Sequence, residues 1–351
     1  MIVYPSAVTI AGQSTAGTAD GFGTNAAFSS PDGISIHPDG SYALLGCYST
    51  DHRVRKVLVS SGLVSVFAGS ATISGSTNGI GTNALFYQPR HVSFSRSGEF
   101  AYVSEHLGVR VITISTVLVG TLAGSGVSGM LDGVGTNAKF SNPYISVVSR
   151  DGTFLLLADI WNNRIRKIII STQQVSTLFG SGATGSINGV GTNAQLNQPH
   201  GIALSSDESY CLMTTLNDNL IRKADMSSLQ VVTVAGQAGV SGLVDGVGTM
   251  TRFYGPVDVK LLPGDSEAII CEYRNSAFRK LILSTYQVST IIGSPPGYGD
   301  GSGTNARFNG PTVLGLSGGS YGFVTDRVNN RIRRIDFTGI PQVLPFYLKY
   351  S

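Results

Sequence analysis

The chain has 351 residues, of which 42% are hydrophobic and only 13% are charged. With 24 basic and 21 acidic residues, its formal net charge of +3 argues against the strongly basic surface that attracts nucleic acids or anionic membranes. Its 45 glycines, 14 tyrosines and 15 phenylalanines argue against a disordered chain and favour a β-rich fold with many tight turns.

Cysteine usage and hydropathy narrow the class further. Cys47, Cys211 and Cys271 lie far apart, which favours buried free thiols over a disulfide framework or a metal site. No apolar run approaches the roughly 18 residues of a membrane-spanning helix, so we expect no membrane insertion. The opening residues, MIVYPSAVTIAGQS, lack the layout of a signal peptide, and residues 7–12 have the pattern of a β-strand.

A glycine-rich segment, DGFGTNAAFSSP, begins at Asp20 and recurs five more times. Gly21 and Gly301 are 280 residues apart and enclose five periods, so the mean period is 56 residues. A fixed period of this size is typical of repeat architectures. The later copies are NGIGTNALFYQP, DGVGTNAKFSNP, NGVGTNAQLNQP, DGVGTMTRFYGP and DGSGTNARFNGP.

Each period continues with the same order of short apolar runs. In the third period, a run follows the proline, a turn occupies residues 150–152 and a second run occupies residues 155–159. A polar turn then leads to the basic run RIRKI at 164–168, and VSTLFG at 175–180 closes the period. Four runs bounded by turn residues indicate four strands, and such units repeated around an axis form the blades of a β-propeller.

The sixth period ends near Asp336 without its fourth strand, whereas residues 7–12 form an unpaired strand at the other end of the chain. We therefore predict an all-β, six-bladed β-propeller of four-stranded antiparallel blades, in which residues 7–12 complete the last blade and remove its exposed edge. The predicted propeller spans residues 1–336 as one domain. Residues 337–351 are an apolar tail or linker for which this ring has no further strand position.

The amino-acid sequence of the repeats resembles that of the NHL-repeat family. The resemblance rests on DIWNNRIRKI at 159–168 and DRVNNRIRRI at 326–335, with their flanking strands, and it extends over residues 7–336. It implies a propeller but no single function, because such propellers include enzymes, RNA-binding proteins, receptors and scaffolds. The second repeat departs from the pattern, since EHLGVRVIT at 105–113 lacks the asparagine pair and, by this comparison, the second arginine.

Each position of the glycine-rich segment has an expected structural role. The glycines at the second and fourth positions of the segment permit positive φ. The residue at the first position caps a turn, and the threonine caps a short helical turn. Two of six copies carry asparagine at the first position, which disfavours a calcium site. The basic runs are expected to form a solvated rim that pairs with acidic residues of the preceding turn. The apolar position is expected to be a buried anchor between blades, formed by Phe28, Phe86, Phe140, Leu196, Phe253 and Phe308.

Residues that differ between blades at the channel mouth are the candidates for function. Two groups of loops should open there: the entry into each first strand and the turn between the second and third strands. Trp161 is the only tryptophan, and the corresponding turns of other blades do not carry one, so the fold does not require it. The predicted binding residues are Asp32, Arg90, His91, Tyr144, Trp161, His200, Asp258 and Tyr273.

We expect a non-enzymatic protein-interaction or scaffold propeller, extracellular or at a cell surface, with no cofactor, no catalytic residue and no metal ligand assigned. The alternative is a propeller that binds a glycan or small ligand at its mouth. The third hypothesis is a metal-dependent hydrolase or lyase using His91, His200, Asp32 and Asp258, a sparse set for a metal. The mixed charge of the mouth disfavours nucleic acid. The expected partner is another protein or further copies of the chain, through residues 340–351.

Overall fold

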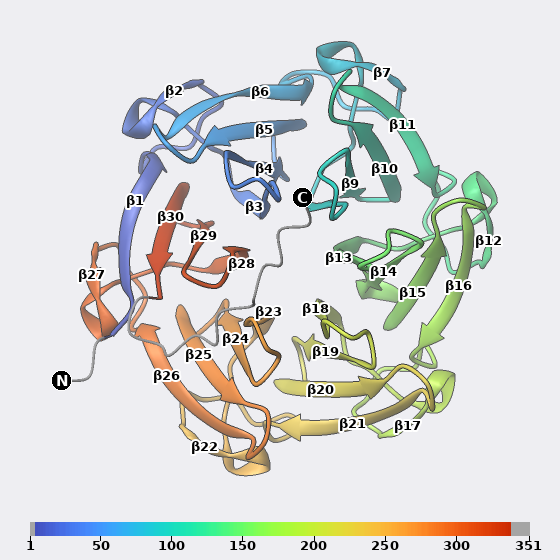
Figure 1. Ribbon diagram of the computed structural model, residues 1–351, viewed down its shortest axis with the longest axis vertical. Helices are drawn as coiled ribbons and strands as arrows, with labels where there is room; N and C mark the ends of the chain where they lie inside the picture. The colour runs from blue at the N-terminus through green and yellow to red at the C-terminus, as the bar shows by residue number, and fades with distance from the viewer. Residues whose placement is uncertain (1–3, 338–351) are drawn as a thin grey trace, which may run out of the picture.

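The computed structural model describes residues 4–337. Six antiparallel sheets stand around a central channel, and the chain visits them in order (Figure 1). This confirms the predicted all-β, six-bladed propeller. Most of the predicted tail lies outside the described residues, including the segment 340–351; Phe337 is described and is buried. Within residues 4–337, no helix is long and apolar enough to cross a membrane.

The first three blades follow the glycine-rich segments in sequence order. Blade 1 comprises β2 (Gly21–Phe22), β3 (Pro31–Ile36), β4 (Tyr42–Cys47), β5 (Arg53–Leu58) and β6 (Leu63–Gly69). Blade 2 comprises β7 (Gly79–Ile80), β8 (His91–Phe94), β9 (Phe100–Glu105), β10 (Gly108–Thr113) and β11 (Leu118–Ala123). Blade 3 comprises β12 (Gly133–Val134), β13 (Pro143–Val148), β14 (Phe154–Asp159), β15 (Arg164–Ile169) and β16 (Gln174–Phe179).

The last three blades repeat this order, with one exchange at the end of the chain. Blade 4 comprises β17 (Gly189–Val190), β18 (Pro199–Leu204), β19 (Tyr210–Thr215), β20 (Leu220–Asp225) and β21 (Gln230–Ala235). Blade 5 comprises β22 (Gly246–Val247), β23 (Pro256–Leu261), β24 (Glu267–Glu272), β25 (Ala277–Ile282) and β26 (Gln287–Gly293). Blade 6 comprises β27 (Gly301–Ser302), β28 (Pro311–Ser317), β29 (Tyr321–Asp326), β30 (Arg331–Asp336) and β1 (Ser6–Gly12).

The N-terminal strand closes the ring. β1 pairs antiparallel with β30, from Ser6 opposite Asp336 to Gly12 opposite Arg331. It takes the place that the fourth strand of each other blade occupies, so the predicted closure is confirmed. Pairing the first strand of the chain with the last also removes an open sheet edge from blade 6.

Each blade has a fifth, two-residue strand that the sequence analysis did not predict. Its residues are the second and third of the glycine-rich segment; in blade 1, Gly21 and Phe22 pair with Val64 and Leu63 of β6. A run of two residues carries no periodicity, which is why its sequence did not indicate a strand. The pairing covers part of the outer edge of every blade.

The glycine-rich segment differs from the expectation in two details, the φ angle at its second position and the absence of a threonine cap. The glycine at the fourth position has a left-handed backbone conformation in every copy, with φ near +53° at Gly23. At the second position, positive φ occurs only in Gly21 and Gly301. At Gly79 and Gly189 a close approach favours glycine, since a Cβ would lie 3.0 and 3.1 Å from the following backbone, whereas at Gly133 and Gly246 a Cβ would make ordinary contacts at 3.4 and 3.5 Å. No threonine side chain caps the following turn. The 3₁₀ turns are Gly23–Asn25, Gly81–Asn83, Gly135–Asn137, Gly191–Asn193, Gly248–Met250 and Gly303–Asn305, with a seventh at Ile160–Asn162.

The basic runs are only partly solvated, which corrects the prediction of a solvated rim. One arginine of each blade has at most 1% of its surface exposed, and in the five blades with a phenylalanine anchor it stands over that ring. In blade 1, Arg55 accompanies Phe28, and their guanidinium carbon and ring centroid are 5.4 Å apart. We call the buried arginine, the first segment residue and the apolar anchor of each blade its seam. The seam arginines are Arg55, Arg110, Arg166, Arg222, Arg279 and Arg333.

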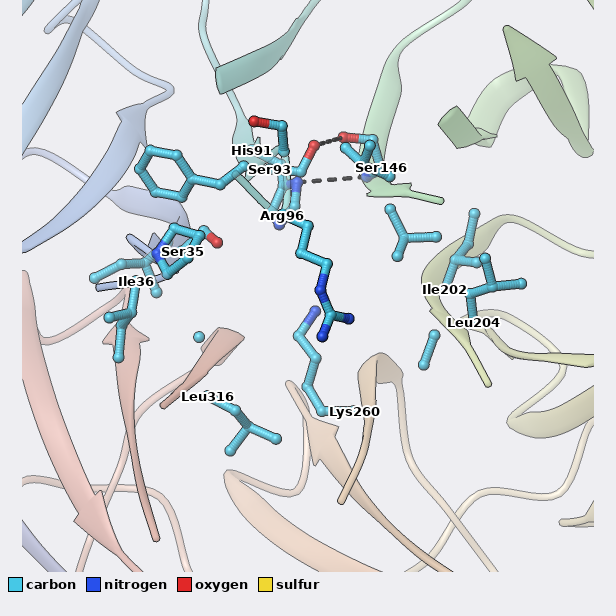
Figure 2. A pocket seen from close by; sticks show the side chains of 18 of the residues that line it. Ser35, Ile36, His91, Ser93, Arg96, Ser146, Ile202, Leu204, Lys260 and Leu316 are labelled. Atoms are coloured by element: carbon cyan, nitrogen blue, oxygen red, sulfur yellow. Dashed lines mark hydrogen bonds between the residues drawn. The ribbon is translucent and has the colours of Figure 1, made fainter. Parts of the chain in front are cut away.

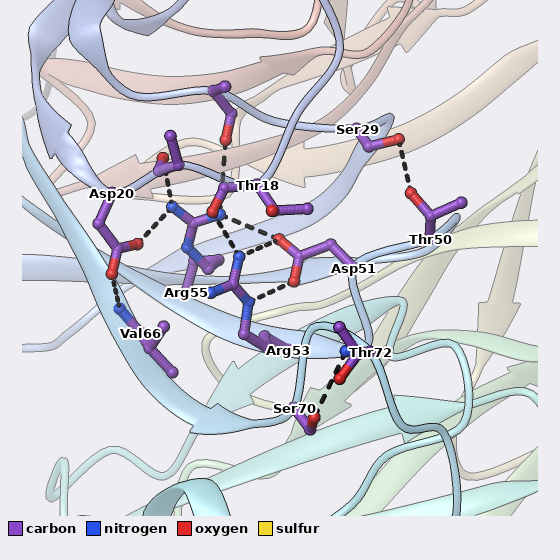
Figure 3. Close-up of polar contacts among 12 residues, drawn as sticks. Thr18, Asp20, Ser29, Thr50, Asp51, Arg53, Arg55, Val66, Ser70 and Thr72 are labelled. Carbon is purple, nitrogen blue, oxygen red and sulfur yellow. Dashed lines mark hydrogen bonds and ion pairs between the residues drawn. The ribbon is translucent and has the colours of Figure 1, made fainter.

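The first residue of the segment pairs with the seam arginine instead of only capping a turn. Asp20 accepts hydrogen bonds from Arg55 at 2.6 Å and from the Val66 backbone N–H at 3.2 Å (Figure 3). Asp51 binds the same arginine at 2.9 Å and also contacts Arg53. Four seam arginines bind two carboxylates each, at 2.6–2.9 Å: Arg55 with Asp20 and Asp51, Arg166 with Asp132 and Asp159, Arg279 with Asp245 and Glu272, and Arg333 with Asp300 and Asp326.

Blade 2 differs from the expectation in which arginine it lacks. Arg110 occupies the seam and is 1% exposed, so the second arginine of the basic run is present. The missing residue is the first, because Gly108 stands where blade 3 has Arg164. The other core predictions are confirmed: all six apolar anchors are fully buried, and Cys47, Cys211 and Cys271 are buried free thiols.

Candidate functional site

Strand register brings the two predicted groups of loops to one end of the channel. In blade 3, Pro143 at the start of β13 pairs with Asp159 at the end of β14. The entry residue Tyr144 and the turn residue Trp161 therefore lie at the same end of the propeller, which we call the mouth. The same register recurs in blade 1, where Pro31 pairs with Cys47.

A cavity of about 270 Å³ opens at the mouth. Blades 2 to 6 contribute to its wall, and five of the eight predicted binding residues lie there: Arg90, Tyr144, Trp161, His200 and Tyr273. We call it the mouth cavity. The remaining lining residues are Asn142, Ile160, Gln198, Leu216, Val257, Thr312 and Arg327.

Asp32 belongs to the same group, although it is fully buried beneath the cavity wall. The Tyr144 hydroxyl donates a 2.7 Å hydrogen bond to its Oδ1. Arg327 Nη1 lies 3.6 Å from Oδ1, and Arg90 Nη1 lies 3.8 Å from Oδ2. Burial and the nearby carboxylate raise the pKa of Tyr144 well above its ordinary value, so it remains a hydrogen-bond donor. Two guanidinium groups facing one carboxylate leave an excess of positive charge at the mouth.

Tyr48 of blade 1 completes this group, and the sequence analysis missed it. The guanidinium carbon of Arg90 lies 4.0 Å from the Tyr48 ring centroid, and that of Arg327 lies 5.2 Å from it. Such cation–π contacts fix the orientation of both arginines. The available signal was its position: Tyr48 directly follows the second strand of its blade, as Tyr273 and Arg327 do. Aligning the turns from that strand end, instead of from the following arginine, would have found it.

The remaining rings of the mouth differ in how open they are. His200 stands edge-on to Tyr144 with ring centroids 5.5 Å apart, and its Nδ1 lies 3.0 Å from the Gln198 carbonyl oxygen. Burial lowers the pKa of His200 to about 4, so the imidazole is neutral at neutral pH. Trp161 is 56% exposed and touches His106 edge-to-face at 5.6 Å between centroids, which leaves part of its indole free for a ligand.

His91 and Asp258 lie elsewhere. His91 is 3% exposed, and its Nδ1 accepts a 3.4 Å hydrogen bond from the Ser146 N–H. It lines a second cavity, of about 340 Å³, in which Arg96 and Lys260 also reach towards the channel axis (Figure 2). Asp258 is 1% exposed, and its oxygens accept hydrogen bonds from Lys260 and the Leu314 N–H.

The structure therefore does not bring together the four residues of the metal hypothesis. His200 lines the mouth cavity, Asp32 lies beneath that cavity, and His91 lines the second cavity. Across the described residues 4–337, no group of three or more His, Cys, Asp or Glu side chains is arranged to hold a metal ion. The geometry at the mouth instead offers aromatic faces and hydrogen-bond donors, which suit recognition of a ligand.

No protein-family model matches the chain. It is similar to NHL repeat-containing protein 2 of Bos taurus, with 26% identity over 192 residues that cover 51% of the chain and 26% of that protein. Together with the six repeats of the chain, this relative supports an NHL-repeat six-bladed β-propeller.

The NHL-repeat propeller is also similar to the protein SUPPRESSOR OF QUENCHING 1, chloroplastic, of Arabidopsis thaliana, with 28% identity over 218 residues. That match covers 58% of the chain and 20% of the plant protein, so the chain spans about a quarter or less of the length of these relatives. An auxiliary nutrient binding protein of Bacteroides thetaiotaomicron has a similar structure, with a TM-score of 0.69 and 19% identity over 94% of this chain and 75% of that chain. At this identity the likeness shows the fold alone.

Proposed function

We propose that this propeller is a non-enzymatic recognition module that binds a partner protein at its mouth and receives an acidic side chain of that partner in the mouth cavity. The observation that supports the proposal most strongly is that side chains from several blades converge on the mouth cavity. Arginine, tyrosine and tryptophan side chains from different blades meet around one cavity, and apart from the matched pair Tyr48 and Tyr273 the equivalent positions of the other blades carry different residues. The repeated fold does not require them there, and these residue types dominate the energetics of protein interfaces.

Charge and size support an acidic side chain as the occupant. Arg90 and Arg327 share a single carboxylate, that of Asp32, and the neutral imidazole of His200 adds no charge. A carboxylate entering the cavity would therefore meet a net positive site with the planar donor geometry that guanidinium groups provide. The cavity volume of about 270 Å³ is below the roughly 300–1,000 Å³ of typical small-molecule pockets, which favours a single side chain or sugar unit.

An acidic sugar is the second candidate, and the exposed indole of Trp161 favours it. Aromatic faces stack on the apolar faces of sugar rings, and Trp161 and Tyr273 both border the cavity. The nutrient-binding protein of similar fold supports ligand binding by such a propeller. A hydrolase or lyase function is less well supported, because His91, His200 and Asp258 are kept apart. Location at a cell surface and assembly through residues 340–351 remain predictions from the sequence.

The proposal can be tested through Trp161, because it is the only tryptophan and lines the mouth cavity. We would titrate the full chain with acidic peptides from a peptide array and, separately, with glucuronate, and follow tryptophan fluorescence. We expect acidic peptides to change the emission saturably, and Arg327→Gln to weaken their binding by about tenfold, the loss of one charged hydrogen bond.

Arg96→Gln is the matched control, since it removes the same charge from the second cavity at a side chain that is exposed. It should leave peptide binding unchanged. A response to glucuronate but not to peptides would replace the partner protein with the acidic sugar. Equal binding by wild type and Arg327→Gln, or no change in emission with either probe, would contradict recognition at the mouth.

A further inference from the structure

An asparagine amide fills the same place in three blades. In blade 3, Asn162 Nδ2 donates to Asp159 Oδ2 at 2.8 Å and to the Gly129 carbonyl oxygen at 2.8 Å. The amide thus bridges the carboxylate at the end of the second strand and a carbonyl three residues before the glycine-rich segment. Blades 5 and 6 repeat both bonds, through Asn275 to Glu272 and Gly242 and through Asn329 to Asp326 and Gly297.

Blade 2 keeps both acceptors of this bridge. Glu105 ends β9, as Asp159 ends β14, and Gly75 stands three residues before the segment that begins at Asn78. The backbone confirms the equivalence of the glycines. Gly75 donates its N–H to the carbonyl of the anchor Phe86, and the three other glycines do the same in their blades: Gly129 to Phe140, Gly242 to Phe253 and Gly297 to Phe308.

Blade 2 has lost the donor. Only two residues, His106 and Leu107, separate β9 from β10, whereas residues 160–163 separate the equivalent strands of blade 3. The shorter turn carries no asparagine, and Gly108 supplies no side chain. A cavity of about 370 Å³ lies at this place, and we call it the blade 2 slot. Its lining includes Gly75, Ser76, Tyr87, Glu105, Leu107 and Gly108.

Glu105 is held less completely than its counterparts. It is 4% exposed and accepts a 3.0 Å hydrogen bond from the Tyr87 N–H, and the Ser76 hydroxyl supports its ionised form. Its distance to the seam arginine, Arg110 Nη1, is 3.6 Å, compared with 2.7 Å between Asp159 and Arg166. Burial raises the pKa of Glu105 to about 7, and burial also raises the pKa values of Asp159, Glu272 and Asp326, so the feature that distinguishes Glu105 is its longer distance to the seam arginine.

We propose that the blade 2 slot binds a primary carboxamide, whose NH₂ group donates to Glu105 and to the Gly75 carbonyl as an asparagine side chain does in blades 3, 5 and 6. The asparagine side chains that occupy this place in blades 3, 5 and 6 indicate the chemical class of the ligand. An amide fits better than an ammonium ion, because Arg110 already lies close to Glu105 and a second cation would be repelled. The blade 2 slot shares no lining residue with the mouth cavity, so this inference is independent of the proposed function.

The test uses protein NMR on the full chain, with the backbone amide signals of Gly75 and Leu107 as reporters. We expect acetamide to shift both signals saturably, whereas N,N-dimethylacetamide, which has no N–H, and methylammonium leave them unchanged. The second source of a carboxamide is an asparagine in a partner protein, represented by Nα-acetyl-asparagine N-methylamide. Tighter binding of this probe than of acetamide would assign the slot to a partner, and equal binding would assign it to a free amide.

Two variants make the test decisive. Replacing residues 106–107 by the four-residue turn of residues 160–163 would place an asparagine in the slot and should abolish the response to acetamide. Asn162→Ala would create a matching vacancy in blade 3, so acetamide should raise its melting temperature more than that of the wild type. The proposal is overturned if methylammonium binds in preference to acetamide, or if acetamide shifts neither reporter in the wild type.

Discussion

The seams and the mouth of this propeller differ in role: the seams stabilise the fold, and the mouth is the candidate binding surface. Each seam uses the same residue types in the same positions: a buried arginine, an aspartate or asparagine, and an apolar anchor. The mouth uses six different sets of residues in equivalent positions. Residues that repeat form the contacts that stabilise every blade. Residues that differ between blades at one common surface are free to bind a ligand or a partner protein. Comparing the copies within one chain therefore separates structural from functional positions.

The seams are not energetically equal, and blade 4 shows why. Arg222 donates to the Gln195 and Ile187 carbonyls at 3.1 Å and to Asn188 Oδ1 at 3.0 Å. Among the described residues it has no carboxylate within 4.0 Å, whereas Arg166 has two. The buried carboxylate of Asp218 interacts with Arg222 from beyond that distance, so Arg222 keeps its hydrogen bonds but has weaker charge compensation than Arg166. The blade 3 seam is thus an ionic network, and the blade 4 seam is a set of charged donors to neutral acceptors.

Arg166→Met should have the largest effect. It removes the cation between Asp132 and Asp159 and leaves the fully buried Asp159 without its ion pair, which costs about 3–5 kcal/mol of unfolding free energy. Urea denaturation followed by circular dichroism would measure the loss. Arg222→Met is the matched variant, and it should cost less, about 1–3 kcal/mol, because no carboxylate lies within 4.0 Å of Arg222 and only the more distant Asp218 loses its charge compensation. Equal losses in the two variants would show that the seam arginines act by packing alone.

Glu105 should make stability depend on pH with an unusual sign. Its folded-state pKa is about 7, above its ordinary value of 4.5, so between these values the folded state binds more protons than the unfolded state. Its contribution is complete at acid pH and is lost as pH rises towards 7, by up to about 3 kcal/mol. Because His200, with its lowered pKa, acts in the opposite direction, the difference between wild type and Glu105→Gln isolates the effect.

Unfolding curves at pH 5 and pH 8 would measure this difference. Relative to the wild type, Glu105→Gln should gain stability between the two values, because the variant has no carboxyl group to ionise. An unchanged difference would place the pKa of Glu105 near its ordinary value and would show that Arg110 compensates its charge despite the 3.6 Å separation.

The sequence predicted the ring because its strongest signals are local and repeated. The copies of the glycine-rich segment set the period, the alternation of apolar runs set the strands, and residues 7–12 supplied the missing edge. Burial of the seam arginines was missed because an arginine in a strand is ordinarily expected at the surface. The comparison of the six repeats contained the signal: arginine occupies the third position of every basic run, whereas the first position is glycine at 108, leucine at 220 and alanine at 277.

The site was predicted in part for the same reason. Arg90, Tyr144 and Trp161 meet at the mouth because strand register fixes where loops open, and register follows from the strand order. His91 was misplaced because side chains alternate along a strand: it stands one residue beyond Arg90, so it faces a different part of the channel. One residue of offset cannot be judged from a sequence until the first paired residue of the strand is known.

Trp161→Ala should have the smallest effect on stability. It therefore tests most strictly whether the residues of the mouth are separate from the residues that stabilise the fold. Its indole is 56% exposed and its ring contact is with His106 at the surface, so its removal should change the unfolding free energy by less than about 0.5 kcal/mol. The same variant should weaken binding at the mouth. If instead it loses stability on the scale of a buried aromatic, about 3 kcal/mol, then Trp161 is a structural residue of its turn and the mouth loses its most exposed recognition surface. If stability is retained while binding falls, the only tryptophan of the chain serves the mouth, where the six blades carry different residues.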